Sequence, residues 1–118
     1  MADISPQDFV SQLHAAVVEV STATYRDLLF NTRADQASDP YWKRVLTLFG
    51  ELTPEQREVL LELTRQVAID ATANVLGIID GACSMNDANS RFRLTYGGRD
   101  LAGELQSLFL EQAEQSSP

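Results

Sequence analysis

Three places along the chain combine a helix-capping residue with a proline at the next position, and they constrain the fold more than any other feature. Ser5-Pro6, Asp39-Pro40 and Thr53-Pro54 each supply a side-chain oxygen that accepts from a free backbone N–H, followed by a residue that suits the first helical turn. At the third place Gln56 adds the reciprocal bond of a capping box. The sequence therefore predicts three helices with independent starts.

Apolar residues at three- and four-residue spacing give these helices their lengths and indicate a fourth. The predicted helices cover about 6–33, 40–50, 54–80 and 100–113. The third ends at the turn pair Asp80-Gly81, and Asp100 is the expected cap of the fourth. We therefore expect one mainly α domain over 1–118, built from four helices.

A short β-hairpin is expected between the third and fourth helices. Phe92, Leu94 and Tyr96 alternate with polar residues, which is the periodicity of a strand. A strand needs a mate for its backbone groups, and the nearest segment is 82–85. This predicts a hairpin over about 82–96, ended by Gly97-Gly98.

The third helix changes character along its length. Over 55–66 it is amphipathic, with Leu60 and Leu63 expected inward and the carboxylates of Glu55, Glu58 and Glu62 on the other side. Over 67–79 it is apolar on nearly every side, which indicates burial on several faces. The second half is therefore either the centre of the domain or part of a subunit interface.

Asp70 and Asn74 interrupt that apolar half one helical turn apart, on one face. A buried carboxylate needs a hydrogen-bond partner or an opposite charge. We therefore expect a buried polar pair. It would serve as a polar site in the core or as a pair that fixes register across a dimer seam, or Asp70 would fix the packing by binding Arg26, Arg65 or a loop backbone.

The overall charge limits the partners. The 118 residues carry 9 Lys and Arg against 17 Asp and Glu, a net charge of −8, and the pI is near 4.4. Nucleic-acid binding draws on Lys and Arg, so it is not expected. A single cysteine, Cys83, the absence of a basic-apolar leader in the first ten residues and the lack of a long apolar run favour a cytoplasmic protein without a membrane span.

The acidic residues concentrate on two predicted helices. Residues 51–80 hold six acids against two arginines, and 100–118 hold four acids and no base. The carboxylates of Glu55, Glu58 and Glu62 are either solvated surface or steer a basic partner. Tyr41-Trp42 begins the second helix, where one ring is expected inward and the other partly exposed, as an interface anchor or as packing under the preceding loop.

The sequence lacks the usual arrangements for catalysis. One histidine and one cysteine cannot form a soft-ligand metal site, and no glycine-rich phosphate loop is present. His14 is interpreted as a semi-exposed structural residue and Cys83 as a small hydrophobe. Acid–base catalysis by Asp70 with Asp80 or His14 is the weakest hypothesis. We therefore expect that the chain is not an enzyme and binds no cofactor or metal ion.

Four segments carry a resemblance to a known class of protein. They read LTRQVAID (63–70), VLGIIDG (75–81), FRL (92–94) and LAGELQSLF (101–109). Over about 40–112 the chain resembles small uncharacterised bacterial helical proteins, some of which are similar to immunity proteins encoded beside secreted toxins. The resemblance implies a bacterial interaction protein and carries over no functional residue.

Two functions follow as hypotheses. In the first, the chain is a non-enzymatic immunity or inhibitor protein that occludes a basic partner such as a toxin domain, with Glu55, Glu58 and Glu62 steering and Tyr41 or Trp42 anchoring. In the second, the chain is a self-associating structural or adaptor subunit, for example a homodimer, that uses the apolar segment 67–79.

Overall fold

The computed structural model describes residues 4–81 and 92–116. Most of this part is helical, and a two-stranded antiparallel hairpin lies between the third and the last helix. The prediction of a mainly α fold with four helices and a short hairpin is therefore confirmed.

The first helix is long and contains an irregular turn. α1 (Pro6–Leu13), the π-helical segment η1 (His14–Glu19) and α2 (Val20–Asn31) follow one another without a break. At its start Ser5 Oγ accepts from the backbone N–H of Asp8 at 3.1 Å, and Asp8 Oδ2 accepts from the N–H of Ser5 at 3.2 Å. This capping box fixes the start at Pro6 as predicted, whereas the end falls two residues before the expected 33.

The next two helices also begin at their predicted caps. After a single 3-10 turn, η2 (Ala34–Gln36), α3 (Pro40–Glu51) begins where Asp39 Oδ1 accepts from the N–H of Tyr41 at 2.8 Å. α4 (Pro54–Asp80) begins with the expected capping box between Thr53 and Gln56. It ends at Gly81, whose φ of +79° is the left-handed conformation that glycine adopts most readily.

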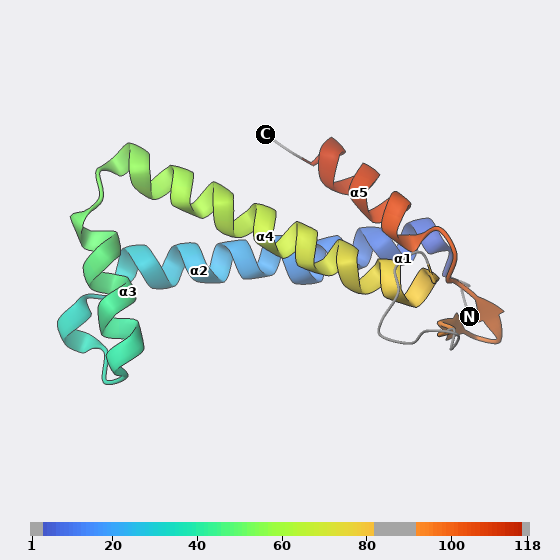
Figure 1. Cartoon of the computed structure of the whole chain (residues 1–118), viewed down its shortest axis with the longest axis horizontal. Helices are drawn as coiled ribbons and strands as arrows, with labels where there is room; N and C mark the ends of the chain where they lie inside the picture. Colours follow the sequence, from blue (N-terminus) through green and yellow to red (C-terminus); the bar gives the residue numbers. More distant parts are fainter. Residues whose placement is uncertain (1–3, 82–91, 117–118) are drawn as a thin grey trace.

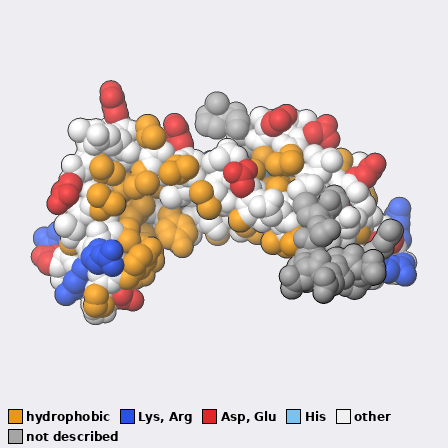
Figure 2. Space-filling model, viewed as in Figure 1, with side chains coloured by type: hydrophobic (Ala, Val, Ile, Leu, Met, Phe, Trp, Pro, Cys, Tyr) orange, Lys and Arg blue, Asp and Glu red, His pale blue; other side chains and the backbone are white. Residues whose placement is uncertain are grey.

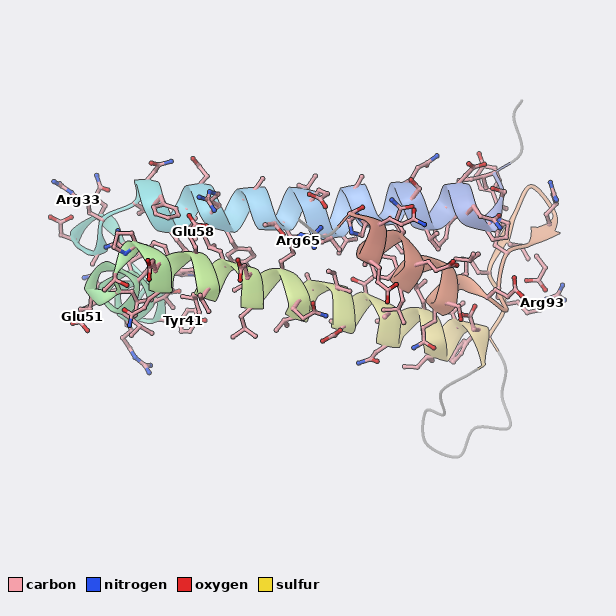
Figure 3. All side chains as sticks on the ribbon, turned by 90° about the horizontal axis from the view of Figure 1, so that it is seen from above. Arg33, Tyr41, Glu51, Glu58, Arg65 and Arg93 are labelled. Carbon is pink, nitrogen blue, oxygen red and sulfur yellow. The ribbon has the colours of Figure 1, made fainter. Side chains whose placement is uncertain are left out.

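Two antiparallel helical rods form a layer, and one further helix packs on each of its two faces. The rod of α1, η1 and α2 lies beside α4 and runs antiparallel to it (Figure 1). α3 packs under one end of this layer, and α5 (Leu105–Gln115) packs on the opposite face at the other end (Figures 1 and 3). The Cα radius of gyration is 17.8 Å, against about 13 Å for a compact domain of this length. The chain is therefore elongated.

This arrangement splits the hydrophobic core in two. One cluster lies under α5 and holds Val10, Val18, Ile69, Ala73, Leu76, Leu105, Phe109 and Ala113. The other lies against α3 and holds Leu29, Leu46, Phe49 and Leu61. No residue is buried between Val18 and Leu29 or between Leu61 and Ile69. The middle of the α2–α4 layer is therefore only two helices thick and has no core of its own.

The described hairpin lies further along the chain than the predicted range of 82–96. β1 (Thr95–Tyr96) pairs with β2 (Arg99–Asp100), with Thr95 opposite Asp100. Gly97 and Gly98 have φ values of +59° and +83° and form the hairpin turn. They do not end the hairpin as expected, and the predicted mate at 82–85 is outside the described residues.

The last helix begins at Leu105, five residues later than predicted, and its start is held from another helix. Asp100 belongs to β2 and does not cap it. Asp80, at the end of α4, does so: its carboxylate accepts from the backbone N–H groups of Gly103, Leu105 and Gln106 at 2.7, 3.2 and 2.8 Å. Asp80 therefore joins α4 to α5, which its interpretation as a turn residue did not foresee.

Within residues 4–81 and 92–116, none of the helices has both the length and the apolar character that crossing a bilayer requires.

Candidate functional site

An apolar groove with a volume of about 390 Å³ runs between α2 and α4 in the uncovered middle of the layer. It is lined by Ser21, Thr22, Tyr25, Leu63, Thr64, Val67, Ala68 and Ala71. Leu63 and Val67 stand at its edge with 57% and 58% of their surface exposed. Large apolar side chains flank a floor of small ones, and no lining residue is charged.

Two of the four hydroxyl groups in this lining, those of Thr22 and Thr64, are hydrogen-bonded within their own helices. Thr22 Oγ1 donates to the carbonyl oxygen of Val18 at 2.6 Å, and Thr64 Oγ1 donates to that of Leu61 at 2.8 Å. Neither hydroxyl hydrogen is free for a ligand. The groove therefore offers apolar contact and few polar contacts, which suits an apolar surface better than a polar small molecule.

Aromatic rings from α3 continue the groove at one end. The ring of Tyr25, a lining residue, stacks on Trp42 with 6.3 Å between centroids and 28° between planes. Tyr41 meets Trp42 edge-on at 5.3 Å and is 58% exposed, whereas Trp42 is half-buried. This is the predicted division of the pair, one ring packed and one exposed. Whether the two rings anchor a partner stays a prediction.

Exposed apolar side chains recur every four residues along α4 and extend beyond the groove. Leu63, Val67 and Val75 are each more than half exposed, and Ala71 completes the row. Val59 is also exposed, but it lies about 160° around the helix from Val75 and outside this face. Figure 2 shows hydrophobic side chains gathered on the face in view, over α3 and the neighbouring half of α4. We call the row and the groove together the α4 face.

The other side of the α2–α4 seam is polar. Arg26 donates two hydrogen bonds to the carboxylate of Glu58, at 2.9 and 2.6 Å, and Arg65 donates one to Glu19 at 2.8 Å (Figure 3). The bonds from Arg26 lower the pKa of the Glu58 carboxyl below its ordinary 4.5. Both partners of that pair are half exposed, so water screens the attraction. The first pair holds α2 and the second holds η1 against α4, on the side away from the groove.

The predicted acidic set is therefore divided. Glu58 is bonded within the chain, while Glu55 and Glu62 are exposed and form no ion pair among the described residues. The structure does not bring Tyr41 and Trp42 into contact with these carboxylates: the rings lie with Tyr25, on the groove side of α4. The steering and anchoring residues of the first hypothesis do not form one cluster.

The predicted burial of Asp70 and Asn74 is wrong for the single chain. Both are exposed, and Asp70 Oδ1 accepts from Gln66 Nε2 of its own helix at 2.9 Å. The inward face of α4 is also shifted, because Leu61 is buried where Leu63 was expected. The reason is the placement of α3 and α5 on opposite faces at opposite ends, which leaves one flank of α4 open along its middle.

His14 is more deeply buried than predicted, with 3% of its surface exposed. Its ring packs against Phe109, with 5.8 Å between ring centroids, and its Nε2 has no hydrogen-bond partner in the described part of the chain. The π-helical turn brings Glu19 Oε1 to 3.6 Å from Nδ1, and that carboxylate also binds Arg65. Burial lowers the pKa of His14 from 6.5, with Glu19 acting against this and Arg65 adding to it.

The residues of the acid–base hypothesis are not assembled. The Asp80 carboxylate binds the start of α5, Asp70 faces solvent, and His14 lies in the core. Within the described ranges, no three His, Cys, Asp or Glu side chains are grouped to hold a metal ion. Cys83 lies outside those ranges.

Sequence reasoning missed the role of Tyr25 and of the small residues Ser21, Ala68 and Ala71. Each looks like an ordinary helical position. The row with four-residue spacing in α4 is the signal that could have found the groove, because a second apolar row, which contains Ile69, Ala73 and Leu76, lies on a different side of the same helix. Two apolar rows on one helix indicate two faces to cover.

No family model matches this chain, and comparison with curated proteins and with solved structures found no similar protein.

Proposed function

We propose that this chain is a non-enzymatic protein-binding domain and that the α4 face is its binding surface. The partner contributes an amphipathic helix whose apolar side chains, three or four residues apart, enter the groove between α2 and α4. The observation that carries the proposal is the exposure of Leu63 and Val67, at 57% and 58%, beside a floor of small side chains. Exposed apolar surface grouped in this way is typical of interaction sites.

The chemistry of the groove supports a protein partner over a substrate. The hydroxyls of Thr22 and Thr64 are bonded to their own helices, and the lining has no charged group to position a reacting atom. At one end the exposed ring of Tyr41 and the half-buried ring of Trp42 add the residue types that most often anchor protein interfaces.

Site-specific photo-crosslinking in the native host tests this proposal. A benzoylphenylalanine replaces Leu63 in one variant and Val20 in the other; Val20 is 58% exposed but does not line the groove. We expect a crosslinked adduct of defined mass from position 63 and none from position 20. Equal crosslinking from both positions, or none from 63, contradicts the proposal.

The toxin-inhibitor hypothesis remains a second candidate because Glu55 and Glu62 are exposed and form no ion pair among the described residues. Clustered carboxylates speed association with a basic partner. Replacing both with Lys should slow association with a basic toxin domain, whereas Glu58→Gln should have less effect, since Glu58 already binds Arg26. Equal rates for the wild type and the double variant would exclude steering by these carboxylates.

A further inference from the structure

We propose that the occupant of the α4 face is a second copy of this chain, so that two α2–α4 layers pack groove to groove about a two-fold axis. This inference rests on the proposed function, because it identifies the partner of the same surface.

The split core indicates why the partner is the chain itself. Between Val18 and Leu29 and between Leu61 and Ile69 no residue is buried, so within residues 4–81 and 92–116 no third layer covers the central helix pair. Helices in stable domains bury their apolar stripe against another element. Every molecule of this protein has the same uncovered apolar groove between α2 and α4. A second copy of the chain is therefore a partner that is always available to cover it. Two-fold dimers are the commonest such solution.

The α4 face also has the form that a two-fold interface needs. An isologous interface uses the same patch on both subunits, so that patch must carry both projections and hollows. Leu63 and Val67 are large and exposed, while Ser21 of α2 and Ala68 and Ala71 of α4 line the groove with small side chains. A two-fold axis through the groove sets the projections of one chain against the hollow of the other.

The charge distribution permits this contact although each chain carries −8. The groove lining holds no charged side chain, and the ion pairs of Arg26 with Glu58 and of Arg65 with Glu19 lie on the other side of the seam. Asp70, three residues after Val67, lies on the same open flank of α4 but outside the lining, so its carboxylate meets the edge of the contact. At that edge it stays in water, and the burial of a charge, which is the costly step in joining like-charged proteins, is avoided.

The area of the face suits a small dimer interface. Leu63 to Val75 span about 18 Å of helix, and two adjacent helices are about 20 Å wide. Two such faces in contact bury roughly 700 Å² in total, and the exposed rings of Tyr25 and Tyr41 add to this area. An interface of this size is at the low end for specific association, so we expect a dissociation constant in the micromolar range.

Sedimentation equilibrium of the full chain tests the inference with two matched variants. Val67 and Val20 are both valine and both 58% exposed, but only Val67 lines the groove. Each is replaced by Glu, and circular dichroism verifies that each variant folds. We expect twice the chain mass of 13.1 kDa for the wild type and for Val20→Glu. Val67→Glu should associate at least roughly 100-fold more weakly, because its carboxylate would be buried.

The inference is overturned if the wild type stays at the mass of one chain when its concentration reaches about 100 times a typical micromolar dissociation constant. Equal loss of association in both variants overturns it as well. These results differ from failure of the proposed function. If the chain is monomeric but position 63 still crosslinks to another protein, the face is a binding site with a different occupant. If position 63 crosslinks to nothing, both proposals fail.

Discussion

Asp80, the last residue of α4, binds Gln106 in the first turn of α5 through a hydrogen bond of 2.8 Å from the backbone N–H to Oδ2. The other carboxylate oxygen accepts from the N–H groups of Gly103 and Leu105. The three donors are free groups at or just before a helix start, where a negative charge is favourable. One side chain thus caps α5 and fixes it to the end of α4.

Asp80→Ala should therefore destabilise the protein. Removing a capping acceptor for three backbone donors is expected to lower the free energy of unfolding by about 1–3 kcal/mol, as measured by urea denaturation. Asp70→Ala is the matched control, because Asp70 is exposed and, among the described residues, its carboxylate bonds only to Gln66 of its own helix. It should change stability by less than about 0.5 kcal/mol. Equal losses in the two variants would show that the cap contributes nothing.

The buried histidine should make stability depend on pH. Burial lowers the pKa of His14 below 6.5 in the folded chain, so as pH falls through 6.5 the unfolded chain takes up a proton that the folded chain does not. The free energy of unfolding therefore decreases between pH 7 and 5. Glu19, Arg65 and Phe109 surround the ring in this state.

His14→Leu removes that proton uptake, and His14 is the only histidine in the sequence. The decrease in unfolding free energy from pH 7 to pH 5 should be smaller in the variant than in the wild type, as measured by urea denaturation at both values. The same variant also removes the unpartnered Nε2 from the core. Parallel pH profiles would mean that the histidine is not buried in its neutral form.

The stacked rings of Tyr25 and Trp42 supply an optical test of the groove's aromatic end. Trp42 is the only tryptophan, so its fluorescence reports this place alone. Tyr25→Ala should shift its emission to longer wavelength and cost about 0.5–1.5 kcal/mol of stability, because the ring contact is lost. Tyr96→Ala is the control: Tyr96 is 47% exposed, against 45% for Tyr25, but lies on β1. The emission of Trp42 in the Tyr96→Ala variant should match that of the wild type.

Two glycine-to-alanine replacements should have opposite effects. Gly81 ends α4 with φ at +79°, where an L side chain is strained, so Gly81→Ala should lower stability by about 1 kcal/mol. Gly50 lies inside α3, and a Cβ added there meets nothing within 4 Å. Gly50→Ala should therefore raise stability by up to about 1 kcal/mol. Thermal denaturation distinguishes the signs, and destabilisation by both would contradict these helix bounds.

Local signals allowed much of the fold to be predicted. The caps at Ser5, Asp39 and Thr53 act within a few residues, so the sequence alone placed three helix starts at their observed positions. The start of α5 could not be predicted in this way. Its cap, Asp80, is 25 residues earlier than Leu105, and no local pattern records a bond over that distance.

The candidate site was harder to predict for a related reason. The all-round apolar character of 67–79 correctly indicated more than one face to cover, but it did not show which faces α3 and α5 cover. Burial of Asp70 was expected because its neighbours are apolar. The packing of α3 and α5 on other sides of α4 leaves Asp70 exposed, and it also exposes Leu63 and Val67. Which side of a helix is covered depends on the whole arrangement, not on the helix.

Solvent paramagnetic relaxation of methyl groups tests the central claim, that the α4 face is covered by a second chain, most directly. In a single chain Val67 and Val20 are equally exposed, at 58%. In purified protein at high concentration, the methyl groups of Val67 should be protected from a soluble paramagnetic probe nearly as well as those of buried Leu76, while those of Val20 stay accessible. Equal relaxation of Val67 and Val20 would contradict the account.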